Sequence, residues 1–153
     1  LPGKISVEAM FRRHAVGGNA PTILVYDLNH RSMVYMYAWD NRADLVTIEQ
    51  HPDRNNFGKE AHGLGDLAAA GRWFGLKAVI DTKQESVIGY IKSNSGQWVQ
   101  LNQKPIPYLD PRANGTTLCI SIGSRKHGTA GNNVLEMDNI RVMQSLPATA
   151  AGE

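Results

Sequence analysis

Two carboxylates in the segment LEMDNIRV, residues 135–142, are spaced so that they could do chemistry together. The segment is typical of a strand, and the two-residue spacing of Glu136 and Asp138 places both side chains on one face of a strand. Paired carboxylates on one face can cleave a glycosidic bond, one as the acid and the other as nucleophile or base. The segment therefore predicts either a catalytic pair or a closing strand that these carboxylates hold in place.

A second segment, SMVYMYAWD, carries side chains that suit sugar binding. Tyr35, Tyr37 and Trp39 alternate with small and aliphatic residues, so their rings share one face of the expected strand. Aromatic rings offer flat apolar area with a polar handle, and the C–H face of a sugar can stack on them. The same alternation also fits an aromatic face that is buried as packing, and the sequence leaves both interpretations open.

Four further residues complete the predicted ligand-binding set. Asp40 and Arg42 directly follow the aromatic strand and could bind sugar hydroxyls. Trp73 and Trp98 would add to the same platform if their strands lie beside it. The predicted site is therefore Tyr35, Tyr37, Trp39, Asp40, Arg42, Trp73 and Trp98.

Short alternating segments bounded by turn residues run along most of the chain. They cover residues 4–11, 21–28, 32–40, 43–50, 72–81, 86–92, 97–101, 116–123 and 134–142. Long loops are expected at 50–65, 102–116 and 123–133, and residues 63–72 allow at most one or two helical turns. About nine strands with almost no helix predict an all-β fold, an antiparallel sandwich, jelly roll or barrel, and among these a two-sheet antiparallel β-sandwich fits best.

Composition limits the classes of function. The 153 residues, 42% of them hydrophobic, suit one domain over residues 1–146 with a tail or linker at 147–153. The formal net charge is only +2 and its cations are scattered, so no nucleic-acid partner is expected. No apolar run is long enough for a membrane span. The chain does not begin with Met, and we expect a mature or excised piece of a longer protein.

Three degenerate motifs follow one another along the chain: a strand of the type W-x-x-L-x-x-x-x-D, a hairpin of the type V-x-x-Y-I-N-G, and a closing strand of the type D-N-I-x-V. The matching residues are Trp73, Leu76 and Asp81; Val87, Tyr90, Ile91 and the Ser95–Gly96 turn; and Asp138, Asn139, Ile140 and Val142. Through these motifs the order of segments resembles the concanavalin A-like (laminin-G-like) jelly-roll superfamily, which includes lectins and carbohydrate-binding modules, and the resemblance implies that the sandwich is a jelly roll.

The resemblance also bears on the carboxylate pair. One group of glucan hydrolases in the superfamily uses a strand of the type E-x-D-x-x-E or E-x-D-x-E, whose last Glu is the acid/base. Here Ile140 or Arg141 stands where that Glu belongs, and an arginine cannot exchange a proton at neutral pH. We therefore expect no catalytic residues, and expect Glu136 and Asp138 to lock a strand by binding its neighbours.

The sequence thus favours a non-catalytic, lectin-like carbohydrate-binding domain of a larger secreted or surface protein, with a glycan or polysaccharide as its partner. The alternatives are a glycoside hydrolase or polysaccharide lyase domain, and a structural or adhesion domain that binds a neighbouring domain, another protein or a second copy. The histidines lack zinc-ligand spacing and no cofactor is expected, whereas the Asp- and Asn-rich loops leave a structural calcium ion open. An extracellular or cell-surface location follows from this interpretation.

Overall fold

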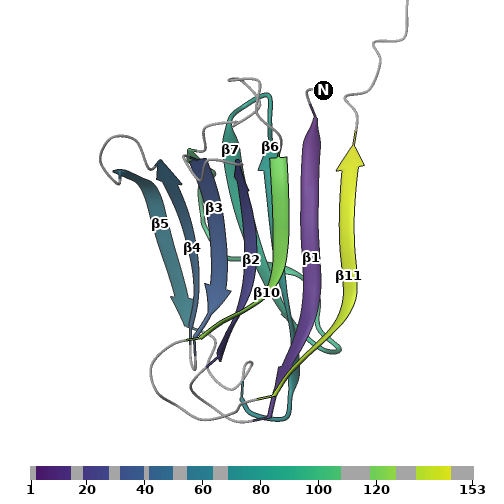
Figure 1. Ribbon diagram of the computed structural model, residues 1–153. Coiled ribbons are helices and arrows are strands. Elements are labelled where there is room, and N and C mark those ends of the chain that lie inside the picture. The colour runs from purple at the N-terminus through teal and green to yellow at the C-terminus, as the bar shows by residue number, and fades with distance from the viewer. Residues whose placement is uncertain are drawn as a thin grey trace, which may run out of the picture.

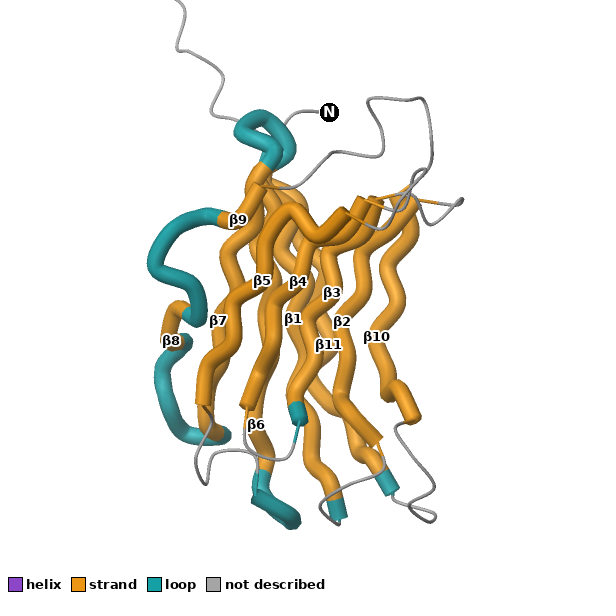
Figure 2. The backbone as a smooth tube through the Cα atoms, turned by 90° about the vertical axis from the view of Figure 1, so that its left-hand side faces the viewer, coloured by secondary structure: helices purple, strands orange, loops and turns teal. Residues whose placement is uncertain are grey.

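The computed structural model describes residues 3–14, 19–27, 32–39, 42–49, 55–63, 69–107, 118–126 and 134–145. These residues form strands joined by turns and loops, with no helix among them (Figures 1 and 2). The described ranges accordingly contain no helix that is long and apolar enough to cross a membrane.

The strands form two antiparallel sheets that face each other (Figure 1). Sheet A has the order β11 (Leu135–Ser145), β1 (Lys4–Arg13), β6 (Trp73–Asp81), β7 (Ser86–Ser93) and β8 (Val99–Gln100), with the short β9 (Ile106–Pro107) also pairing with β7. Sheet B has the order β10 (Leu118–Lys126), β2 (Asn19–Asp27), β3 (Ser32–Ala38), β4 (Arg42–Glu49) and β5 (Asn55–Gly63). The predicted two-sheet antiparallel jelly roll is confirmed.

The core lies between the two sheets and is built from alternate residues of the strands. Phe11 of β1 and Phe74 of β6 are fully buried neighbours, with ring centroids 6.2 Å apart. From sheet B, β3 contributes Val34, Met36 and Ala38, each without exposed surface. Because side chains alternate between the faces of a strand, the residues between these positions lie on the outer faces.

Strand β5 corrects the sequence analysis, which expected a loop over residues 50–65. Residues 55–63 pair antiparallel with β4, with a register shift between Thr47 and Ile48. The segment NNFGKEAHG lacks the alternating apolar residues that indicate a strand. An edge strand can form through backbone hydrogen bonds to one neighbour, so its side-chain pattern need not alternate. Similarly, β10 continues to Lys126, into the loop expected at 123–133.

A buried asparagine attaches the chain after β8 to strand β7. Asn102 accepts a hydrogen bond from the Gly89 backbone N–H at 2.8 Å. Its side-chain amide donates to the carbonyl oxygens of Val87 at 3.2 Å and Lys104 at 2.6 Å. Strands β8 and β9 have only two residues each and can bond few backbone groups of β7. The three hydrogen bonds of the Asn102 side chain bond further backbone groups and so hold the segment that carries β8 and β9 in place.

Candidate functional site

The aromatic stripe of β3 lies on the outer face of sheet B. The residues between its members, Val34, Met36 and Ala38, point into the core, which is one of the two orientations that the sequence left open. The side chains of Tyr35 and Trp39 are half-buried, whereas Tyr37 between them is only 9% exposed. The aromatic rings are therefore not part of the layer between the sheets.

The three rings form a continuous ladder along the strand. Tyr35 and Tyr37 have ring centroids 4.7 Å apart with a tilt of 36°. Tyr37 and Trp39 meet edge to face, with centroids 5.4 Å apart and an interplanar angle of 82°. Such contacts stabilise aromatic pairs beyond their buried area, so each ring holds the next in a fixed orientation.

A chain of polar contacts fixes the middle of this ladder. Arg42 of β4 pairs with the fully buried carboxylate of Asp44 at 3.1 Å. Burial raises the pKa of the Tyr37 hydroxyl, its hydrogen bond to Asp44 raises that pKa further, and a hydrogen bond with Trp39 lowers it. The tyrosine is thus a neutral donor to Asp44, while Arg42 keeps nearly half of its side chain exposed to solvent.

A second arginine reaches the other end of the ladder. Arg125 of β10 donates from Nη1 to the Tyr35 hydroxyl at 3.2 Å, and its guanidinium carbon lies 5.6 Å from the centroid of the Tyr35 ring. Arginine keeps several donors in a planar fork, so one bond to Tyr35 leaves others for a ligand. The outer face of sheet B thus presents two partly exposed rings, with the Arg125 side chain on Tyr35 and with the Trp39 backbone N–H bonded to the Arg42 carbonyl oxygen at 2.7 Å.

The structure divides the predicted ligand-binding residues between two sheets. Tyr35, Tyr37, Trp39 and Arg42 come together on sheet B, whereas Asp40 lies outside the described residues. Trp73 belongs to β6 of sheet A, and Trp98 to the β7–β8 connection of the same sheet. Neither lies on a strand beside β3, so neither joins the aromatic stripe.

Two polar residues of this face were missed by the sequence analysis. Asp44 follows Arg42 by two residues on one strand, and this spacing could have indicated it. Arg125 is separated from Tyr35 by 90 residues and by the strand β2, so the sequence carries no comparable signal for it.

The carboxylate pair on β11 makes structural contacts. Glu136 lies opposite Arg12 and accepts hydrogen bonds from its guanidinium, one of them from Nε at 3.0 Å, and it also contacts His14. Asp138 lies opposite Met10 on the same face and accepts the backbone N–H of Asn139 at 2.7 Å. Asn139 has a φ of 51°, at a register shift between β1 and β11.

The hydrogen bond to His14, followed by that to Arg12, holds the pKa of Glu136 below its usual value. A carboxylate that stays ionised to lower pH than usual, between Arg12 of β1 and His14 just after it, is suited to fixing the register of β11. The contacts of Glu136 reach outside β11 and are of the strand-locking kind expected from the sequence, whereas the hydrogen bonds of Asp138 are to Asn139 of its own strand.

In the described part of the chain, no group of three or more His, Cys, Asp or Glu side chains is placed so that it could hold a metal ion. Most of the loop residues that leave calcium open, at 50–54, 108–117 and 127–133, lie outside the described residues.

Comparison with known proteins shows the fold. No protein-family model matches the chain, and no curated protein matches it. Among solved structures, a GH43 protein of Bacillus licheniformis, BlXynB, is 15% identical with a TM-score of 0.59, over 94% of this chain and 28% of that one. An alginate lyase of Klebsiella pneumoniae is 11% identical with a TM-score of 0.53, over 94% and 61%.

A GH131 β-glucanase catalytic domain of Podospora anserina is 14% identical with a TM-score of 0.50, over 99% of this chain and 62% of that one. This chain therefore spans less than two thirds of each of these three structures. The neighbours are concanavalin A-like jelly-roll proteins, and this chain has the same fold, as its sequence motifs indicated. It is a jelly-roll domain.

Proposed function

We propose that this protein is a non-catalytic carbohydrate-binding domain that binds a glycan on the outer face of sheet B. The observation that carries the proposal is the ladder of Tyr35, Tyr37 and Trp39, which faces away from the core with the rings at its two ends partly exposed. Aromatic rings held rigidly by neighbours give contact area at low entropic cost, which favours stacking against a sugar ring.

The polar groups around the ladder support the same ligand class. Arg42 and Arg125 lie near its two ends, where their remaining N–H groups can donate to sugar hydroxyls. Asp44 is committed to Arg42 and to Tyr37, so its role is to hold these two side chains. The site therefore offers two stacking surfaces with charged donors beside them.

Enzymatic alternatives draw on the same fold, because glycoside hydrolases and a lyase are among the structural neighbours. Retaining cleavage needs two carboxyl groups about 5–5.5 Å apart on opposite sides of the scissile bond. On the aromatic face, the described carboxylate Asp44 is fully buried and paired. Glu136 and Asp138 lie on sheet A, engaged with neighbouring side chains or backbone. This arrangement favours binding over catalysis.

The proposal is tested on a glycan array with the wild-type protein and with Tyr35→Ala. We expect a defined set of glycans to bind wild type and to bind the variant more weakly. Incubation of the bound polysaccharide with wild type should release no new reducing or unsaturated ends. Release of such ends would overturn the binding proposal in favour of a hydrolase or lyase. An array on which no glycan binds would favour a domain that binds protein.

A further inference from the structure

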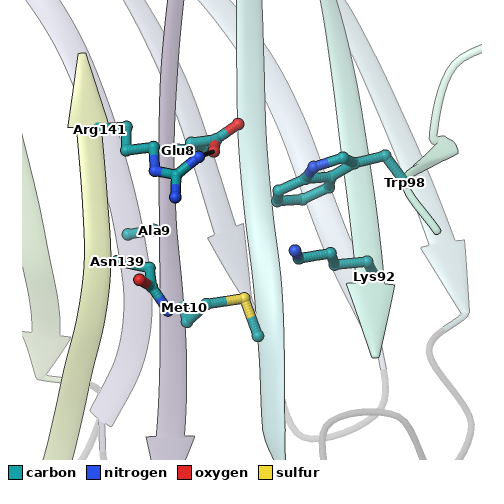
Figure 3. Close-up of a pocket in the computed structure, with 7 residues that line it drawn as sticks. All are labelled: Glu8, Ala9, Met10, Lys92, Trp98, Asn139 and Arg141. Atoms are coloured by element: carbon teal, nitrogen blue, oxygen red, sulfur yellow. Dashed lines mark ion pairs between the residues drawn. The ribbon is translucent and has the colours of Figure 1, made fainter. Parts of the chain in front are cut away.

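A hollow of about 120 Å³ lies on the outer face of sheet A, on the side of the sandwich away from the aromatic ladder. Figure 3 shows Trp98 and Lys92 on one side of it and residues of β1 and β11 on the other. Its lining residues are Glu8, Ala9, Met10, Lys92, Trp98, Asn139 and Arg141. Because drug-sized ligands fill pockets of about 300–1,000 Å³, this hollow has room for a single small ring or headgroup.

The indole of Trp98 lies across strand β6 at a glycine. Gly75 pairs with Met10 on one side and with Lys92 on the other, so these three positions form one row across the sheet. A Cβ built on Gly75 would lie 2.8 Å from Cη2 of Trp98 and 2.9 Å from Sδ of Met10. The missing side chain of Gly75 therefore allows the indole to lie close against the sheet, between its neighbours.

Two lysines flank this indole. The ammonium of Lys92 lies 4.7 Å from the ring centroid of Trp98, and that of Lys77 lies 5.4 Å from it. Lys77 pairs with Glu8 at 3.1 Å, whereas Lys92 has no ion pair with any residue that the structure describes. Lys92 is thus a cation held beside an aromatic face without an anionic partner in the described ranges.

The charge of the hollow is positive. Glu8 is its single carboxylate, and Arg141 approaches it only at 4.0 Å with most of the arginine side chain exposed. Since Lys77 already neutralises Glu8, Lys92 and Arg141 remain to attract an anion. Asp138, the adjacent carboxylate on β11, is not among the lining residues and accepts the backbone N–H of Asn139.

We propose that this hollow is a second binding site, which takes one uronic acid residue of an acidic polysaccharide. The C–H face of the sugar ring stacks on Trp98, and its carboxylate pairs with Lys92 and Arg141 across the hollow. Asn139 and Glu8 bind the sugar hydroxyls. An acidic peptide would use the same cations, but a flat aromatic face beside them favours a ring. The site is independent of the glycan site proposed on sheet B.

Isothermal titration calorimetry with trigalacturonic acid tests this site. We expect the wild-type protein to bind it, and its methyl ester to bind at least about tenfold more weakly because the ester lacks the charge. Trp98→Ala and Lys92→Gln should each weaken binding by about tenfold or more. The matched control Trp73→Ala, on the same face of sheet A, should leave the affinity unchanged, and melting of each variant shows that it is folded.

The remaining arms separate this site from the alternatives. Trp39→Ala should leave trigalacturonate binding intact, because its ring lies on the other sheet. The proposal is overturned if wild type does not bind trigalacturonate, if Lys92→Gln binds it as wild type does, or if Trp39→Ala alone abolishes binding. Pentaglutamate that binds as tightly and competes would instead identify the hollow as an acidic-peptide site.

Discussion

The indole of Trp98 and the backbone of Gly75 are in such close contact that a Cβ on Gly75 would come within 2.8 Å of the ring. The contact joins the β7–β8 connection to the middle of sheet A, because β6 lies between β1 and β7. It depends on the absence of a side chain at a position where the outer face of the sheet would otherwise carry one.

Replacing Gly75 with alanine should therefore lift Trp98 off the sheet. The added methyl group also meets Met10 and Lys92, and overpacking of this kind costs about 1–3 kcal/mol. We expect a lower free energy of unfolding in urea and a shift of tryptophan emission to longer wavelength. Gly123→Ala is the matched control, since a Cβ there meets nothing within 4 Å. A Gly75→Ala protein as stable as wild type, with unchanged emission, would contradict the close contact.

Asn102 should be essential for the stability of the segment after β8. Alanine at this position leaves the Gly89 N–H and the carbonyl oxygens of Val87 and Lys104 without their amide partner. The bonds to Gly89 and Val87 are buried, and each buried polar group left unsatisfied costs about 1–3 kcal/mol, so we expect the free energy of unfolding to fall by at least about 2 kcal/mol.

The control for Asn102 is Asn94→Ala in the exposed turn after β7, where a surface substitution should change stability by less than about 0.5 kcal/mol. Equal effects of the two substitutions in chemical denaturation would show that the Asn102 hydrogen bonds do not stabilise the fold.

Glu136 should give the protein a pH-dependent increment of stability. Its pKa is lowered in the folded state by His14 and Arg12, so the increment is present above the ordinary glutamate pKa of about 4.3 and is lost as the pH falls through the lowered value. We expect Glu136→Gln to lower the melting temperature near neutral pH, and we expect the difference from wild type to vanish in acid.

Glu85→Gln serves as the control for Glu136. Glu85 is an exposed glutamate in the turn before β7 that has no ion pair with a described residue. A Glu136→Gln difference that is the same size at neutral and acid pH would rule out the proposed role of the carboxylate charge.

The sequence predicted the sandwich because most strands carry a pattern that burial imposes. In β6, the alternation of large apolar residues directly gives the face that packs in the core, whereas the alternation in β3 left open which face is buried. The edge strand β5 was missed, since a strand with one backbone partner needs no such pattern.

The site was only partly predictable for a related reason. Alternation places Tyr35, Tyr37 and Trp39 on one face, but the order of strands decides which other residues join them. Arg125 joins through the pairing of β10 with β2, and Trp98 is excluded because its segment belongs to sheet A. Sheet order arises from contacts between distant segments, which a single sequence does not display.

The central claim is that the aromatic face of sheet B binds a glycan, and Trp39→Ala tests it most directly. The affinity for the glycan found on the array should be measured by calorimetry, and the melting of each protein should be followed alongside. Trp73→Ala on the opposite sheet is the matched control, and it should bind as wild type does.

The account predicts that Trp39→Ala weakens glycan binding by about 1–3 kcal/mol, as truncation of a contact residue does. Its stability should fall by less than about 2 kcal/mol, because the half-buried ring gives up less than the 3–5 kcal/mol of a core aromatic. A variant that loses about 3–5 kcal/mol of stability, while neither it nor wild type binds any glycan, would contradict the claim.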